Sequence, residues 1–303
     1  MIAWFYRAAR GLSRLLGPWV VGFFAWWVAA GYFLFRPARR RESERFFGAV
    51  FPGAGRPRRL ALAWRQFQGF AGLFADRLRL TQGQPVEHEE EGFGHLVECA
   101  APGRGAVLLM SHLGSWEAAA LLTRRKGLRL MVFMGARGRE QVERLQKAEL
   151  AAEGLELVVL GDGPAGAEGA LGTLRALQFA RQGGLVGMSG DRLWGAGQRV
   201  VEGRFFGHRV RLPAGPHLFA LAAGVPVVTF FALRLGRRRY QLVASAPRWL
   251  EARGRADRWG AVERSAQAYL DGLAEVVRRH PAQWYHFEPF LEGSPGEGGS
   301  SPA

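Results

Sequence analysis

From about residue 95 onward, short apolar runs alternate with stretches in which apolar residues recur at helical spacing. The apolar runs are rich in Val, Leu, Met and Phe, which is typical of buried strands. Strands are expected over residues 105–111, 128–135, 155–161, 183–191, 225–233 and 238–247. Helices are expected over residues 115–125, 139–154, 165–182, 215–224 and 257–280. This alternation predicts an α/β fold in which a mostly parallel mixed sheet is covered by helices on both faces.

Before this pattern lies an uncharged apolar stretch, residues 17–35, which contains three tryptophans. It is bracketed by arginines, namely Arg7, Arg10, Arg14, Arg36, Arg39, Arg40 and Arg41. A helix needs roughly 20 apolar residues to span a membrane, so the stretch predicts an N-terminal hydrophobic membrane-anchoring helix. A helix embedded in one leaflet, a buried core helix and a cleaved signal peptide are the alternatives, and the last lacks a small-residue cleavage site.

Residues 42–80 are predicted to be amphipathic helix, interrupted by "FPGAGRP" at 51–57. This part is interpreted as a core helical hairpin, as a basic, aromatic surface that contacts a membrane, or as both on opposite faces. We divide the chain into a membrane anchor (1–41), a folded domain (42–292) and a disordered tail (293–303). More arginines follow the apolar stretch than precede it, which favours a cytoplasmic position for the folded domain.

The composition narrows the partners. The 303 residues include one cysteine, Cys99, which excludes an intrachain disulfide and a thiolate metal cluster. The net charge of +15 favours acidic partners, such as an anionic membrane surface or an acidic carrier protein. The runs at 36–41 and 234–239 are candidate docking sites. Nucleic acid is not expected, because the chain has no zinc-finger spacing, no aromatic RNP-like segment and no obvious helix-turn-helix.

The candidate chemistry lies in "HLGSWE", directly after the strand predicted at 105–111. Gly114 and Ser115 allow a tight turn and an N-cap, and Glu117 lies one helical turn further on. A carboxylate that accepts the Nδ1–H of His112 would fix its tautomer and leave Nε2 to take a proton from a hydroxyl. The alternative is that both residues are structural, since an acid is favoured in the first turn of any helix.

The residues around His112 resemble the motif of a known family. The phrase "LLMSHLGSWEAA" resembles the H-x-x-x-x-[D/E] motif of the lysophospholipid acyltransferase superfamily, in its bacterial lipid A biosynthesis branch. "FMGARG", with Arg137 or alternatively Arg139, is similar to the second block of that family, and "SGDR" is similar to the third. The stretch 205–228, with Pro226, and the closing "PAQWYHFEPF" follow in the expected order, so the resemblance spans about residues 10–292.

The resemblance implies a membrane-associated O-acyltransferase. It would move an acyl chain from a thioester, acyl carrier protein or coenzyme A, to a hydroxyl of a lipid A precursor or a related glycolipid or phospholipid. His112 would be the general base and Glu117 its orienting acid. The resemblance also implies the bacterial inner membrane with a cytoplasmic domain, an acyl carrier protein as partner and a membrane lipid as acceptor. A non-catalytic, membrane-tethered binding or assembly protein on the same fold is the alternative.

The other implied site residues would bind substrate. Arg137 and Arg192 would hold phosphate, with Asp191 positioning Arg192 or the acceptor, and Pro226 would lie in the acceptor region. Backbone amides at the helix start, from Gly114 and Ser115 to Trp116, would stabilise the oxyanion. No cofactor and no metal is implied: the acidic run "HEEE" (88–91) is interpreted as solvated, because consecutive side chains rarely converge on one ion. The histidines outside the motif are interpreted as structural.

Overall fold

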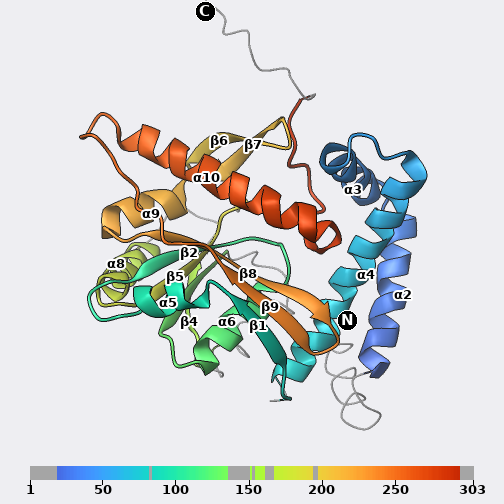
Figure 1. Cartoon of the computed structure of the whole chain (residues 1–303), viewed down its shortest axis with the longest axis horizontal. Helices are drawn as coiled ribbons and strands as arrows, with labels where there is room; N and C mark the ends of the chain where they lie inside the picture. Colours follow the sequence, from blue (N-terminus) through green and yellow to red (C-terminus); the bar gives the residue numbers. More distant parts are fainter. Residues whose placement is uncertain are drawn as a thin grey trace, which may run out of the picture.

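The computed structural model describes residues 19–81, 84–135, 151, 154–160, 167–193 and 197–293. Three helices begin this part of the chain: α2 (Trp19–Phe35), α3 (Pro37–Val50) and α4 (Arg56–Thr81). They are followed by β1 (Glu87–Glu91), α5 (Phe93–Cys99), β2 (Ala106–Met110), α6 (Trp116–Arg125), β3 (Leu130–Gly135), β4 (Glu156–Leu160), α8 (Ala167–Arg181) and β5 (Leu185–Ser189). The remainder comprises β6 (Val200–Phe205), β7 (His208–Pro213), α9 (Gly215–Ala223), β8 (Val227–Gly236), β9 (Arg239–Ala244), α10 (Arg258–Arg279) and a 3-10 turn (Pro281–Gln283) (Figure 1).

The described strands form a seven-stranded sheet in the order β1-β9-β8-β2-β5-β3-β4, with a separate hairpin of β6 and β7. Neighbouring strands are parallel except β8 and β9, which are antiparallel. The mostly parallel mixed sheet is therefore confirmed. The helix expected over 139–154 falls largely outside the described residues.

Helices cover both faces of this sheet, as expected. Successive side chains of a strand point to opposite faces, and β2 shows the consequence. Val107 and Leu109 join a core with α8, α9 and α10, whereas Leu108 and Met110 join a core with α5 and α6. All five residues of β2 are buried, so the strand is central to the fold and its end is rigidly held.

The pattern of apolar residues missed the polar elements. The acidic run "HEEE" is part of β1, an edge strand whose backbone pairs with β9. Its carboxylates form ion pairs, Glu89 with Arg239 and Glu90 with Lys126, so the run is a charged edge and not merely a solvated stretch. Charged side chains on an edge strand oppose aberrant pairing with other strands. The hairpin β6–β7 and the short helix α5 were also not predicted.

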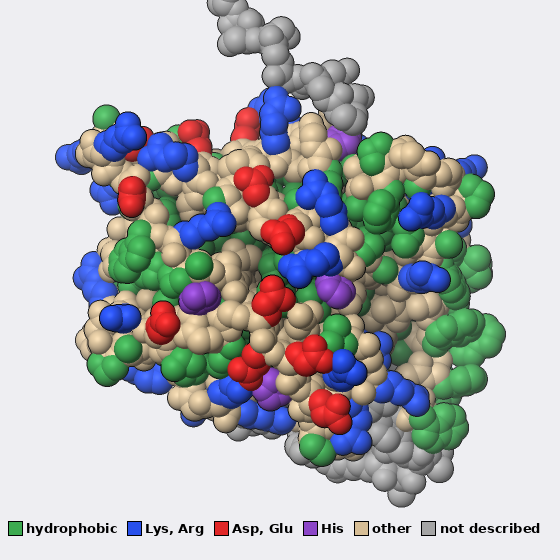
Figure 2. Space-filling model, viewed as in Figure 1, with side chains coloured by type: hydrophobic (Ala, Val, Ile, Leu, Met, Phe, Trp, Pro, Cys, Tyr) green, Lys and Arg blue, Asp and Glu red, His purple; other side chains and the backbone are tan. Residues whose placement is uncertain are grey.

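The N-terminal helices differ from a simple anchor. In the described part of the chain, no single helix is both long and apolar enough to cross a membrane; α2 and α3 would suffice together, but they are bent by 89°. The expected boundary after residue 41 falls within α3. α2 packs against α4 and exposes large apolar side chains along the flank of the molecule seen at the right of Figure 2, namely Trp19, Phe23, Phe24, Trp26, Trp27, Val28, Tyr32, Leu34 and Phe35.

Helices α3 and α4 contribute buried residues to the core, as expected for a core helical hairpin. Phe46 and Phe47 of α3 are buried in the same cluster as Trp284. Near its end α4 carries two consecutive buried charges. Asp76 pairs with Arg234 of β8, and Arg77 pairs with a residue of the candidate site. The helical hairpin is therefore fastened to the sheet on the side where the sheet carries its chemistry.

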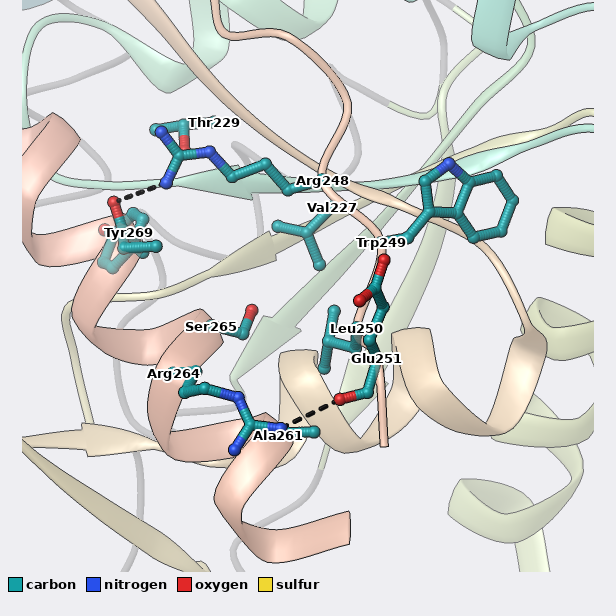
Figure 3. Close-up of a pocket in the computed structure, with 11 residues that line it drawn as sticks. Val227, Thr229, Arg248, Trp249, Leu250, Glu251, Ala261, Arg264, Ser265 and Tyr269 are labelled. Atoms are coloured by element: carbon teal, nitrogen blue, oxygen red, sulfur yellow. Dashed lines mark hydrogen bonds between the residues drawn. The ribbon is translucent and has the colours of Figure 1, made fainter. Parts of the chain in front are cut away.

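A cavity of about 200 Å³ opens between α10 and the first part of β8 (Figure 3). Its lining includes Thr229, Arg248, Ser265 and Tyr269. Behind Ser265 lies the buried His217, whose Nδ1 is 2.9 Å from the Ser265 hydroxyl and whose pKa is lowered by burial to about 4. No described residue among those predicted for the site lines this cavity.

Candidate active site

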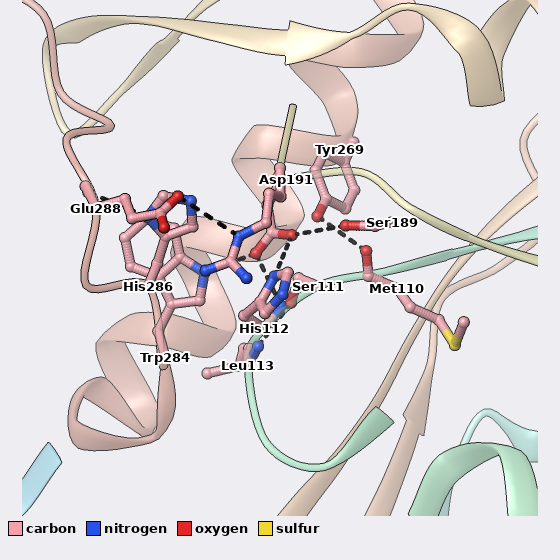
Figure 4. Close-up of polar contacts among 11 residues, drawn as sticks. Met110, Ser111, His112, Leu113, Ser189, Asp191, Tyr269, Trp284, His286 and Glu288 are labelled. Atoms are coloured by element: carbon pink, nitrogen blue, oxygen red, sulfur yellow. Dashed lines mark hydrogen bonds and ion pairs between the residues drawn. The ribbon is translucent and has the colours of Figure 1, made fainter. Parts of the chain in front are cut away.

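The candidate site lies at the carboxyl ends of β2 and β5, which are adjacent and parallel. His112 follows β2 and Asp191 follows β5, so the sheet brings them together although they are far apart in sequence (Figure 4). The Nδ1 of His112 is 2.9 Å from Oδ1 of Asp191, and the backbone N–H of His112 donates to Oδ2 at 2.8 Å. The Asp191 side chain is fully buried, whereas that of His112 is 20% exposed.

Both carboxylate oxygens of Asp191 accept further hydrogen bonds. Ser189 Oγ donates to Oδ1 at 3.1 Å and Trp284 Nε1 donates to Oδ2 at 3.0 Å. Burial by itself raises the pKa of a carboxyl group, but the charge of His112 and the hydrogen bonds from its ring and backbone hold the pKa of Asp191 well below the usual range. Asp191 is therefore an ionised acceptor for the Nδ1–H of His112.

The expected contact between Glu117 and Nδ1 of His112 is wrong. Asp191 occupies that nitrogen, and Oε1 of Glu117 instead accepts from Nη1 of Arg77 at 2.7 Å. The same contact gives Asp191 a role that the sequence did not indicate, and its expected positioning of Arg192 or of the acceptor stays a prediction. The reason is geometric: Glu117 lies in the first turn of α6, next to α4, which supplies a guanidinium that is only 3% exposed. A buried guanidinium needs a carboxylate more than a neutral imidazole does.

The turn between β2 and α6 is built as expected, but its amides are engaged. Ser115 is the N-cap of α6, and its Oγ accepts from the N–H of Ala118 at 3.2 Å. The backbone N–H of Gly114 donates to the carbonyl of Gln283, and that of Ser115 donates to the carbonyl of Ala232. These two amides therefore hold the turn in place, which corrects their expected role in stabilising an oxyanion.

Gly114 is required by this turn, and we expect Gly114→Ala to lower the free energy of unfolding by more than about 3 kcal/mol. Its φ of 72° lies in the left-handed region, and a Cβ there would come within 2.1 Å of the backbone oxygen of Ala232. Gly127→Ala is the matched control, since its φ is 83° but nothing lies within 4 Å of its Cβ. The control should lose only about 1 kcal/mol in urea unfolding. Equal losses in the two variants would contradict the close approach at Gly114.

Beside the pair lie Arg192, His286 and Glu288. Nε of Arg192 is 4.0 Å from Oε2 of Glu288, and the Arg192 side chain is 17% exposed. Burial lowers the pKa of His286 to about 4, so its ring is neutral at pH 7 and its Nδ1–H donates to the carbonyl of Glu288. The ring of His286 meets that of His112 edge to face, with centroids 6.1 Å apart. Arg192 is therefore the cation next to the His112–Asp191 pair.

The remaining predicted site residues are Arg137 and Pro226. Arg137 and its alternative Arg139 lie outside the described residues. Pro226 lies before β8, and its carbonyl accepts from the N–H of Val107 at the start of β2. His112 follows the opposite end of that strand, roughly 16 Å away for five residues at about 3.3 Å each. Pro226 therefore does not lie beside the His112–Asp191 pair, and its expected contact with substrate stays a prediction.

The basic run at 234–239 is largely committed to contacts within the protein. Arg234 pairs with Asp76, and the guanidinium of Arg238 donates to the carbonyl of Pro85. Arg239 pairs with Glu89. These contacts fasten the β8–β9 hairpin to α4 and β1. The run therefore offers an acidic partner fewer available guanidinium groups than its sequence indicates.

Trp284 and His286 belong to the site, although the sequence indicated no individual role for Trp284 and a structural one for His286. Their rings stack at 5.1 Å with an interplanar angle of 22°, beside Asp191 and His112 (Figure 4). The only signal in the sequence was the segment "PAQWYHFEPF", which resembles the closing segment of the family. That resemblance does not indicate which residues the segment contacts. The segment extends the candidate site from two strand ends to three parts of the chain.

Comparison with known proteins identifies the family of this chain. The sequence profile of the family described as bacterial lipid A biosynthesis acyltransferase matches residues 1–291. The chain therefore belongs to the bacterial lipid A biosynthesis acyltransferase family. It is also similar to the phosphatidylinositol mannoside acyltransferase of Mycobacterium tuberculosis, in strains CDC 1551 / Oshkosh and ATCC 25618 / H37Rv, with 26% identity over 214 residues. That match covers 65% of this chain and 58% of the relative's length.

Proposed function

We propose that this protein is a lipid O-acyltransferase whose general base is His112. The observation that carries the proposal is the hydrogen-bonded pair of His112 and the ionised, buried Asp191 at adjacent strand ends. Because Nδ1–H is donated to the carboxylate, the tautomer places the ring's lone pair on Nε2. An imidazole held in this way can take the proton of a hydroxyl on Nε2, and its side chain is accessible from solvent.

The reaction that fits this pair is direct acyl transfer. The hydroxyl oxygen of the acceptor attacks the carbonyl carbon of a thioester while its proton passes to Nε2 of His112. Asp191 stabilises the imidazolium that forms. The carbon–sulfur bond then breaks, and the proton passes from His112 to the leaving sulfur. The products are an ester and a thiol, and no acyl-enzyme is formed.

The charges around the pair support a phosphate-bearing substrate. Arg192 directly follows Asp191, and its planar guanidinium suits a phosphate of the donor or of the acceptor. Its counter-ion Glu288 is 4.0 Å away, which is a loose ion pair that an incoming phosphate can compete for. The backbone N–H of Trp116, in the first turn of α6, is the candidate donor to the oxyanion.

The family and the relative support the acceptor that we propose, and the net charge supports the donor. The acceptor that we propose is a lipid A precursor or a related glycolipid or phospholipid, consistent with the family match and with the mannoside named for the mycobacterial relative. The donor that we propose is an acyl carrier protein thioester in preference to coenzyme A. An acidic carrier would be attracted by the net charge of +15.

The proposal also includes attachment to the cytoplasmic face of the bacterial inner membrane. The exposed aromatic side chains of α2 would enter the leaflet, and Arg36 and Arg41 beyond them would face anionic headgroups. Such a helix can lie in one leaflet without crossing the membrane. The acceptor lipid and the site would then be held by the same surface.

The test of the function uses the purified full chain, an acyl carrier protein thioester and a lipid acceptor in mixed vesicles. A thiol-reactive dye follows the thiol released, and mass spectrometry follows the ester formed. We expect one ester for each thiol. Thiol without ester would indicate a thioesterase, and neither product would indicate a non-catalytic binding protein.

The test of the membrane surface is a double substitution on α2. We expect Phe23→Glu with Trp27→Glu to lower partitioning onto vesicles of phosphatidylglycerol and phosphatidylethanolamine by more than about tenfold, because each buried aromatic side chain contributes about 1.5–3 kcal/mol. Both side chains are more than half exposed, so the substitutions should not disturb the fold. Leu171→Glu with Leu174→Glu on α8 is the matched control, since both leucines are similarly exposed. Equal losses in the two double variants would refute a membrane surface on α2.

A further inference from the structure

We infer that Trp284 is a positioning residue for the proposed reaction: its indole N–H fixes the carboxylate of Asp191 in the orientation that holds His112. The inference rests on the proposed function for its consequence in catalysis, but the hydrogen bond itself can be tested without substrate. Trp284 lies 93 positions beyond Asp191 in the sequence and comes from the segment that follows α10.

The four hydrogen bonds of Asp191 are divided evenly between its two oxygens. Oδ1 accepts from the His112 ring and from Ser189, and Oδ2 accepts from the His112 backbone and from the indole of Trp284. Rotation of the carboxylate would break several of these bonds at once. The indole is the donor that comes from outside β2, β5 and the residues directly after them. It therefore ties the orientation of the pair to the C-terminal segment.

The backbone of Trp284 is fixed by hydrogen bonds to the turn between β2 and α6, which also carries His112. Trp284 forms an antiparallel bridge with Leu113. On either side of this bridge, the N–H of Gly114 donates to the carbonyl of Gln283, and the N–H of Tyr285 donates to the carbonyl of His112 at 2.7 Å. The amide of Gln66, from α4, donates to the carbonyl of Trp284. A shift of the segment would therefore move the turn that carries His112.

The indole ring is also held firmly by packing. It is 1% exposed and contacts the rings of Phe46, Phe205 and Phe290, with centroids 4.7, 5.4 and 5.1 Å away. The ring of His286 is stacked on it. A buried indole N–H needs an acceptor, and this one has a carboxylate, which makes the hydrogen bond stronger than a bond between neutral groups.

The first experiment measures the hydrogen bond directly. The full chain is labelled with ¹⁵N at the tryptophan indoles, and the signal of Trp284 is assigned by Trp284→Phe. We expect this N–H to resonate downfield and to exchange slowly with solvent, and we expect Asp191→Asn to move the signal upfield. The indole of Trp249, which is 61% exposed, is the internal control and should not move. An unmoved Trp284 signal would overturn the inference.

The second experiment measures the consequence for turnover. Replacing Trp284 with benzothienylalanine exchanges the N–H for sulfur and retains the size of the ring, so the packing is preserved where Trp284→Phe would leave a void. We expect kcat to fall about tenfold with KM unchanged, the scale of one hydrogen bond to a charged group. Phe219→Leu truncates a buried ring of the same core whose ring contact is with Phe133, so it should lower Tm and leave kcat of the folded enzyme unchanged.

The outcomes separate this inference from the proposed function. If the indole signal responds to Asp191→Asn but the wild type transfers no acyl chain, the hydrogen bond stands and the proposed function fails. If the wild type transfers acyl chains and the benzothienylalanine variant retains full kcat, the proposed function stands and the positioning role fails. Loss of kcat in the Phe219→Leu variant to the same degree would also overturn the role, because it would assign the effect to core packing alone.

Discussion

Replacing His112 with alanine is expected to lower kcat for acyl transfer by about 10²–10⁴-fold, the contribution of a positioned general base. The acceptor hydroxyl would have to lose its proton to water while it attacks the thioester. The substitution also removes the ring that donates to Asp191, so a second variant is needed. His112→Asn retains an N–H directed at the carboxylate but has no basic nitrogen, and it should lose activity to the same extent while keeping the wild-type Tm.

The matched control for this result is His88→Ala on the edge strand β1, where the histidine pairs with Glu90 and lies three strands away from β2 in the sheet. It should retain wild-type kcat. If His112→Asn turned over as fast as the wild type, His112 would not be the base.

Asp191→Asn is expected to lower kcat on the order of 10³-fold, although it changes few atoms. An asparagine can present its N–H₂ to Nδ1 of His112, and the ring would then carry its proton on Nε2. In that tautomer the nitrogen that should accept the proton of the acceptor hydroxyl is already protonated. The change is therefore expected in kcat, while KM for the thioester stays close to the wild-type value.

The control for the aspartate is Asp271→Asn, the same chemical change on the exposed side of α10, where the carboxylate accepts from Gln267. It should have no effect on kcat. Glu117→Gln gives the sharper comparison, since it removes the charge that pairs with the buried Arg77 and should lower the free energy of unfolding by about 3–5 kcal/mol. A full loss of turnover in a stable Glu117→Gln variant, together with an active Asp191→Asn variant, would reverse the assignment of the orienting acid.

The sheet could be predicted because its strands are apolar and flanked by glycine. β2 and β5 are buried nearly along their whole length, and runs such as "AVLLM" are hard to interpret otherwise. β1 could not be predicted in the same way, because "EHEEE" contains no apolar residue and pairs only through its backbone at the edge. The same holds for β6, whose sequence "VVEGRF" is interrupted by a glycine that packs against Leu270 of α10.

The site was predicted in part because chemistry in parallel sheets gathers at the carboxyl ends of strands. That rule placed His112 and Asp191 at one edge, but local spacing suggested the wrong partner. Glu117 is five positions from His112 in the sequence, and its actual partner, Arg77, comes from a helix 40 positions earlier. The contact of Trp284 with Asp191 crosses 93 positions and follows no periodicity. Contacts of this kind depend on how α4 and the C-terminal segment pack, which a single sequence does not express.

The role of His112 in acyl transfer is tested most directly by lipid mass spectrometry. Cells that express the wild type are compared with cells that express His112→Asn at the same level. We expect one class of membrane glycolipid or phospholipid to gain the mass of one acyl chain only in cells that express the wild type. This lipid class would also identify the acceptor. If the same lipid gained the chain in both strains, His112 would not be the general base. If no lipid class differed between these cells and cells without the protein, the purified wild type would be supplied with an acyl carrier protein thioester and the lipids of its native host. If no ester formed there either, the protein would not be the acyltransferase proposed here.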